Sequence, residues 1–303
     1  METIITLQDT LKSKDTEEWI DLVFYRPLGY LWALFFKQIH VTPNIVTILS
    51  ILLGIAAGVM FCFTDLWLNA IGMLLLIWAN TYDSADGQLA RMTGNYSRAG
   101  RMLDGAAGDI WFIAIYAAIC LRLTPEWSFW IWALAAFTGY FHGKQAAMAD
   151  YFRNFHLLFI KGKKRSELED YIKLKEQTQY LTWKNNFFEK FFLLFYIPYT
   201  RDQEAWTPKL QQFRKTLTEQ FGDEDLPEDF REDFRQASKP MMKYCNLLTF
   251  NTRTIVLCIC LLTNFPWVYF IFELTVMNLL LIYTLRTYEN ICQRFDIRLR
   301  GNA

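Results

Sequence analysis

The sequence predicts an all-α integral membrane protein. Hydrophobic residues make up 53% of the 303 residues and aromatic residues 17%, whereas charged residues make up only 20%. Many apolar residues gather in runs of roughly 20, the length that a helix needs to cross a bilayer. Charged stretches separate some of these runs, so we expect transmembrane helices together with a polar region outside the membrane. The net charge of zero argues against a nucleic-acid-binding protein.

Six apolar runs predict six transmembrane helices and divide the chain into four parts. The predicted helices begin near residues 43, 66, 100, 127, 245 and 266. The four parts are an amphipathic juxtamembrane segment at 1–40, transmembrane helices one to four at 41–160, a helical cytoplasmic or interfacial insert at 161–244, and transmembrane helices five and six with a basic tail at 245–303.

The juxtamembrane segment and the first span carry clear helix signals. Apolar residues recur at helical spacing through 19–35, with basic residues nearby, so we expect a helix that lies along the membrane surface. A soluble helix packed on the insert is the alternative. The first span opens at Thr42, which can cap it, and Gly54 and Gly58 provide a face for close helix contact.

The insert contains an aromatic stretch between two mixed-charge regions. The stretch at 183–198 is too short to cross a bilayer, so we expect it to lie in the membrane interface or to cover the motif described below. Helices are expected around it at 161–175, 206–221 and 228–239.

The basic residues predict which side of the membrane each part faces. The loops near 64–65, 122–126 and 264–266 contain a single lysine or arginine, Arg122. Because cytoplasmic loops are enriched in basic residues, we expect the opposite loops, the insert and both termini to face the cytoplasm. The predicted location is a cytoplasmic or inner membrane.

Four carboxylates and an arginine interrupt the apolar sequence between 83 and 109. A charge at the centre of a transmembrane helix costs about 2.5–3.5 kcal/mol, so these groups need partners. Asp83 and Asp86 are three residues apart and share a helix face, and Asp104 lies on the next helix. Three carboxylates from two helices predict a site for one or two Mg²⁺ or Mn²⁺ ions, which substrate phosphates complete.

The residues around these acids suit a phosphorylated substrate. Gly87 and Ala90 are small and permit close approach, and Arg91 can bind phosphate in bidentate fashion. In-line attack of a hydroxyl on a pyrophosphate is the reaction that such a site favours. The alternative is a structural ion-pair network, for example Arg91 with Asp83 and Asp104.

The spacing of this motif resembles the signature of a known family. The pattern Asp-x2-Asp-Gly-x2-Ala-Arg-x8-Gly-x3-Asp, from Asp83 to Asp104, is similar to that of the CDP-alcohol phosphatidyltransferases. Thr42-Pro43-Asn44 and the six-helix layout are also similar. The resemblance implies a CDP-linked donor, release of CMP, and a homodimer. It implies metal binding by Asp83, Asp86 and Asp104 and a CDP site lined by Gly87, Ala90, Arg91 and Gly100.

One position departs from the family pattern. The family has a fourth aspartate where this chain has Gly108, and Asp109 follows one residue later. At about 100° per residue, Asp109 points about 140° away from Asp104 on a regular helix. A π-bulge within 105–108 would turn Asp109 into the site as base or metal ligand, and this is the interpretation we favour. Otherwise the usual base is absent or supplied from elsewhere.

Three cations near the predicted cytoplasmic side suggest an acceptor that carries a phosphate. Lys144, Arg153 and Arg253 form this set, and inositol phosphate and glycerol phosphate are examples of such acceptors. The alternative is that these side chains snorkel to the membrane interface. We interpret His142 as a packing residue.

We therefore predict a CDP-alcohol phosphatidyltransferase that moves a phosphatidyl group from CDP-diacylglycerol to a hydroxyl of a polar acceptor such as inositol phosphate. One alternative is a CDP-ethanolamine, CDP-choline or CDP-inositol type of donor with a diacylglycerol or ceramide acceptor. Another, motivated by Gly108, is a non-catalytic membrane protein that binds nucleotide or metal or assists assembly.

Overall fold

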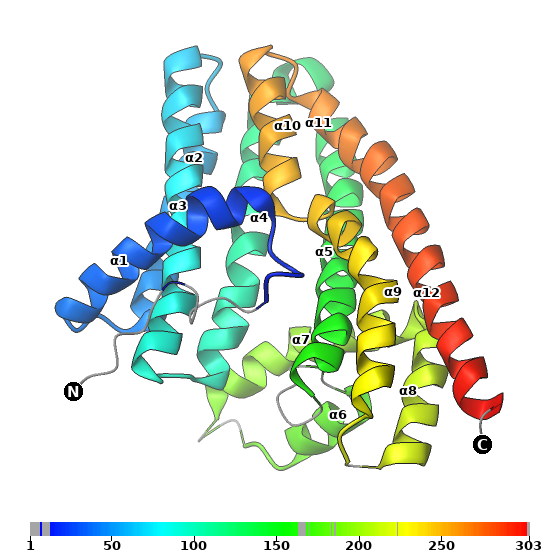
Figure 1. Ribbon diagram of the computed structural model, residues 1–303. Helices are drawn as coiled ribbons and strands as arrows, with labels where there is room; N and C mark the ends of the chain where they lie inside the picture. The colour runs from blue at the N-terminus through cyan, green and yellow to red at the C-terminus, as the bar shows by residue number, and fades with distance from the viewer. Residues whose placement is uncertain are drawn as a thin grey trace. The chain divides into compact units, whose positions relative to one another are not determined.

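The protein is helical throughout the part that the computed structural model describes. That part comprises residues 7, 13–162, 168, 170–182, 184, 186–222 and 224–301, and no strand occurs within it. The predicted all-α class is therefore confirmed. Figure 1 labels the helices, and the chain divides into two compact units. Unit 1 comprises Met1–Gly143 and Phe250–Thr275, and unit 2 comprises Lys144–Thr249 and Val276–Ala303.

Unit 1 contains the helices that carry the charged motif. Its elements are a π-helical turn η2 (Asp21–Tyr25), α1 (Arg26–Gln38), α2 (Pro43–Phe61), α3 (Leu66–Thr93), α4 (Arg98–Trp127), the first part of α5 (Trp130–Lys161), α10 (Phe250–Leu262), α11 (Trp267–Phe272) and the start of a second π-helical turn, η4 (Glu273–Met277).

Small residues let α2 pack closely along both α3 and α4. A Cβ atom added at Gly54 would collide with the ring of Trp111 on α4. A Cβ atom added at Gly58 would lie 3.1 Å from the backbone carbon of Ala114. The predicted close-contact face of the first span is therefore confirmed. Thr42 stands at the N-cap position of α2, but its side chain makes no capping hydrogen bond, so that expectation was wrong.

Helix α1 packs against the half of α3 that carries the motif. Ala33 and Phe36 of α1 share a buried apolar cluster with Ala85 and Leu89 of α3. A Cβ atom added at Gly29 would lie 2.9 Å from Ser84 Oγ, so only glycine permits this approach. The opposite face of α1 exposes large apolar side chains, as an amphipathic helix does.

Unit 2 contains the insert and parts of two long helices. Its elements are the second part of α5, α6 (Tyr171–Gln179), α7 (Phe187–Ala205), α8 (Pro208–Phe221), α9 (Glu228–Leu247), the end of η4, and α12 (Asn278–Gly301). Phenylalanine rings fill its core, and the rings of Phe159 on α5 and Phe234 on α9 stack with centroids 3.9 Å apart. The insert is thus a packed helical bundle that includes part of the predicted fourth span.

Two predicted helices of the insert have different bounds. The helix expected at 161–175 is α6, which begins at Tyr171 because Asp170 caps it by accepting from the Ile172 amide at 2.9 Å. Residues 163–167 and 169 lie outside the described part. The helix expected at 228–239 continues to Leu247, because its apolar face stays buried.

Four described helical stretches are long and apolar enough to cross a membrane. They are Pro43–Phe61, Gly100–Trp127, Glu228–Leu262 and Trp267–Gly301. They coincide with the predicted first, third, fifth and sixth spans. Helices α3 and α5, the predicted second and fourth spans, are not among them. Four of the six predicted spans therefore correspond to helices with the length and composition of a membrane span.

Candidate active site

Two consecutive helices of unit 1 bring the halves of the motif together. The C-terminal half of α3 carries Asp83 to Arg91, and α4 carries Gly100 to Asp104. Helix α3 ends at Gly94, whose φ of 67° is a left-handed conformation that glycine adopts readily. Ser97 then caps α4 by accepting from the Gly100 amide at 2.8 Å. This short turn folds the two acidic segments against each other.

The three motif carboxylates meet in one cluster, as predicted. Asp83, Asp86 and Asp104 each offer an oxygen, and these oxygens lie within 4.8 Å of one another. Asp86 is buried, Asp83 is half-buried and Asp104 is exposed, so the cluster opens to the outside at Asp104. Oxygen ligands around one Mg²⁺ at about 2.1 Å lie roughly 3–4 Å apart. The cluster therefore fits one or two hard divalent ions after small side-chain movements.

A residue that the sequence analysis missed positions the buried carboxylate. Thr47 of α2 donates a hydrogen bond from Oγ1 to Asp86 Oδ2 at 2.5 Å. Asn44, Thr47 and Ser50 follow one another at three-residue spacing in an otherwise apolar span. Polar residues in such a span usually face the bundle interior, so this spacing was the available signal.

Arg91 lies beside the cluster, and its guanidinium is only partly hydrogen-bonded within the described part of the chain. Its two terminal nitrogens would lie 3.4 Å from a Cβ atom added at Gly87, so the guanidinium covers this glycine. Its Nε is buried and has no hydrogen-bond partner among the described residues. The guanidinium is also attracted by the charges of Asp86 and Asp104, an interaction that a phosphate-binding site and the structural-network alternative have in common. A guanidinium in this state has donors left for a phosphate.

Gly100 and Ala90 complete the predicted nucleotide-binding residues. A Cβ atom added at Gly100 would lie 2.5 Å from Asn44 Oδ1 and 2.7 Å from Ser97 Oγ, so a larger residue there would displace these two side chains. Ala90 is half-buried on α3. Both lie on the two motif helices of unit 1.

The N-terminal segment also contacts the motif, which the sequence analysis did not predict. Gln88, inside the motif, donates from Nε2 to the backbone oxygen of Arg26 at 3.1 Å. The Arg26 side chain is held by a two-point contact with Glu17 at 2.9 and 3.0 Å. The start of α1 is thus attached to the helix that carries Asp83 and Asp86.

The predicted π-bulge at 105–108 is absent. Residues 98–127 form one α-helix, so Asp109 keeps its position about 140° from Asp104 around the helix axis. Asp109 is exposed, and it is not a member of the cluster of three carboxylates. The favoured interpretation, in which a π-bulge turns Asp109 into the site, is therefore wrong. A Cβ atom added at Gly108 meets nothing within 4 Å.

The three cations proposed for an acceptor each have a protein partner. Arg253, in unit 1, is 1% exposed, and its Nη1 lies 2.5 Å from Glu273 Oε2 and 2.6 Å from His142 Nδ1. Tyr116 Oη lies 2.9 Å from the same His142 nitrogen, which agrees with a packing role for the histidine.

The other two cations lie in unit 2. Lys144 pairs with Asp202, and Arg153 donates from Nε to Asn246 Oδ1 at 2.9 Å. Each cation therefore contacts groups of its own unit. Arg253 belongs to unit 1, whereas Lys144 and Arg153 belong to unit 2, so neither unit contains all three.

These features define an all-helical protein with membrane-spanning character and an acidic cluster beside the Arg91 guanidinium. Residues 40–149 match the family model described as CDP-alcohol phosphatidyltransferase. The match is to this segment of the chain, which resembles a CDP-alcohol phosphatidyltransferase domain.

One curated relative is a protein of Aquifex aeolicus (strain VF5) named Bifunctional IPC transferase and DIPP synthase. It is 32% identical over 98 residues, which are 32% of this chain and 22% of the relative. The chain thus covers less than a quarter of the length of that relative. No solved structure matches the chain significantly.

Proposed function

We propose that this protein transfers a phosphatidyl group from CDP-diacylglycerol to a hydroxyl of a polar acceptor such as inositol phosphate, and that CMP is released. The observation that carries this proposal is the cluster of Asp83, Asp86 and Asp104 next to the Arg91 guanidinium. The match of residues 40–149 to the family supports a CDP-linked donor.

The chain's own residues bind and orient the donor. Asp83, Asp86 and Asp104 would together hold two Mg²⁺ or Mn²⁺ ions. Such ions, when bound, neutralise the pyrophosphate and make CMP a better leaving group. Arg91 binds the phosphate oxygens, while Gly87, Ala90 and Gly100 leave room for the nucleotide.

The reaction forms one P–O bond and breaks another. The acceptor hydroxyl oxygen attacks the phosphorus that carries the diacylglycerol, in line with the oxygen that bridges to CMP. The bridging bond breaks, and its electron pair leaves with CMP. We assign the hydroxyl proton to Asp104, the exposed carboxylate of the cluster, in preference to Asp109, because Asp109 lies on another face of α4.

The acceptor and the topology are further parts of the proposal. The positive charge for an acceptor phosphate would come from Lys144, Arg153 or Arg253, each after exchange of its present protein partner. Six spans place both termini and the motif on the cytoplasmic side of a cytoplasmic or inner membrane, with α3 and α5 as the two less apolar spans. A homodimer is expected from the family.

The test is release of CMP by the purified full-length protein in lipid nanodiscs with Mn²⁺. CDP-diacylglycerol is offered with inositol phosphate, glycerol phosphate or inositol, and CDP-ethanolamine is offered with diacylglycerol. Release of CMP with CDP-diacylglycerol alone supports the proposal. Release with CDP-ethanolamine alone supports the alternative, in which a small CDP-alcohol is the donor and diacylglycerol is the acceptor. Binding of nucleotide without CMP release under every condition would establish a non-catalytic protein instead.

A further inference from the structure

Helix α7 of unit 2 has two unlike faces. Phe187, Phe191 and Leu194 stand at helical spacing on one side and are 53%, 43% and 53% exposed. Thr200 and Gln203 are buried on the other side. The amphipathic helix therefore presents a row of large, partly exposed apolar side chains on one face.

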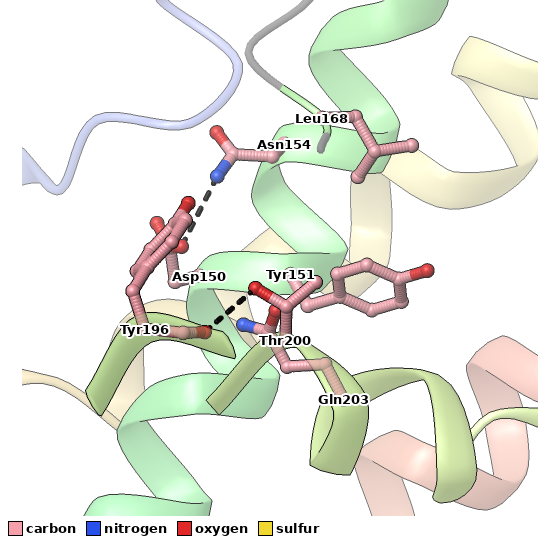
Figure 2. Close-up of a pocket in the computed structure, with 7 residues that line it drawn as sticks. All are labelled: Asp150, Tyr151, Asn154, Leu168, Tyr196, Thr200 and Gln203. Carbon is pink, nitrogen blue, oxygen red and sulfur yellow. Dashed lines mark hydrogen bonds between the residues drawn. The ribbon is translucent and has the colours of Figure 1, made fainter. Parts of the chain in front are cut away.

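The buried side of α7 is attached to α5 by polar contacts. Gln203 donates from Nε2 to the backbone oxygen of Ala147 at 2.8 Å. Figure 2 shows a small pocket between the two helices, in which Tyr196 and Thr200 of α7 face Asp150 of α5. This attachment determines which face of α7 points outward, so the exposed apolar row is a property of the folded unit.

The composition around this row suits an anionic lipid surface. Residues 161–190 contain eight lysines and arginines against five acidic residues, whereas residues 201–235 contain six against ten. Lys173 and Lys175 on α6 and Lys184 before α7 are exposed. Exposed apolar side chains flanked by basic ones are typical of helices that lie in the interface of a membrane.

The position of α7 in the chain keeps it near a bilayer. Stretches that can cross a membrane precede the insert, at Gly100–Trp127, and follow it, at Glu228–Leu262. Helix α7 itself is not among the stretches apolar enough to cross. It is therefore tethered close to lipid and too polar to span it.

We propose that α6 and α7 form an interfacial anchor, in which the row of Phe187, Phe191 and Leu194 enters the headgroup region of the bilayer. The lysines at 173, 175 and 184 bind anionic phospholipid headgroups beside this row. The anchor does not depend on the transferase reaction, so its test needs no turnover.

The experiment uses the full-length protein in nanodiscs of phosphatidylcholine, with or without phosphatidylglycerol. A photoreactive benzoylphenylalanine replaces Phe191 in one variant, and Lys215, an exposed residue of α8, in the matched control. Adducts are identified by mass spectrometry after irradiation. We expect lipid adducts at position 191 with at least about a threefold excess over position 215, and a higher yield when phosphatidylglycerol is present.

Two outcomes would overturn the anchor. Equal lipid adducts at both positions, or none at 191, would show that the row does not meet the bilayer. Cross-links at 191 to a second copy of the chain would make this face a protein interface. A K173E/K175E/K184E variant tests the headgroup contact separately, because its adduct yield at 191 should lose the dependence on phosphatidylglycerol. Monodisperse elution and an unchanged circular dichroism spectrum confirm that each variant is folded.

Discussion

Thr47 of α2 donates a hydrogen bond to the buried carboxylate of Asp86 on α3, with 2.5 Å between Oγ1 and Oδ2. This contact joins the first span to the acidic cluster. Outer-shell partners of metal ligands orient them and tune their affinity. The first span therefore contributes to the site although it carries none of the motif.

Replacing Thr47 by valine removes this donor at nearly constant volume. We expect Mn²⁺ to bind roughly tenfold more weakly, because Asp86 loses the group that orients it. Electron paramagnetic resonance of free Mn²⁺ in a titration measures this change. Thr47→Ser keeps the hydroxyl and should bind the ion as the natural protein does. Equal affinity of the valine variant would show that the hydrogen bond does not act on the site.

Asp104→Asn should remove most transfer activity without unfolding the protein, since the side chain is exposed. We expect CMP release to fall by about 100-fold or more, because the cluster loses a charged ligand and the assigned base. Thermal unfolding without metal should be unchanged within a few degrees. Activity close to that of the natural protein would be decisive against the proposed enzyme mechanism.

The one-residue displacement of the fourth acid can be tested by moving it back. Gly108→Asp places a carboxylate one helical turn after Asp104, and a Cβ atom there meets nothing within 4 Å. We expect this variant to fold and to keep or increase CMP release, whereas Asp109→Asn should lower it by less than about threefold. Loss of activity in Asp109→Asn together with rescue by Gly108→Asp would instead return the base role to the fourth acid.

The buried pair of Arg253 and Glu273 should be more important for stability than for substrate binding. Both side chains are at most 1% exposed, and Tyr269 also donates to Glu273 at 2.7 Å. Glu273→Gln leaves the guanidinium without its counter-charge, which costs about 3–5 kcal/mol for a buried pair. Thermal unfolding of the protein in nanodiscs measures the loss.

The matched control for this pair removes both charges. An R253M/E273L variant should recover most of the stability, since no unpaired charge remains buried. Its KM for a phosphorylated acceptor then reports whether Arg253 has a second role. A KM at least tenfold above that of the natural protein, with stability restored, would support the proposed contact between Arg253 and the acceptor phosphate.

Local patterns in the sequence were sufficient for the helical class and for the cluster. The sequence was sufficient to predict that Asp83, Asp86 and Asp104 cluster. Their spacing and the short turn after Gly94 leave the two helices few ways to pair. The bounds of α6 and α9 could not be obtained in this way. Those ends depend on the cap at Asp170 and on which apolar residues of α9 become buried.

The segment 105–108 illustrates the limit of sequence reasoning. Its glycines and alanines accept either a regular α-helix or a π-bulge at similar cost, so composition cannot decide between them. The folded chain continues as an α-helix, and Asp109 stays outside the cluster. Arg253 is a second example, because its partner Glu273 lies on a different helix and no spacing rule connects them.

The sequence alone thus determined the membrane-spanning character, the family motif and the three acids of the site, since each follows from periodicity or spacing within about 20 residues. The tertiary structure decided which polar groups the acids and cations meet, namely Thr47 for Asp86 and Glu273 for Arg253. It also decided which face of α7 stays uncovered. These outcomes depend on how different helices pack against one another, and such packing leaves no regular spacing in the sequence.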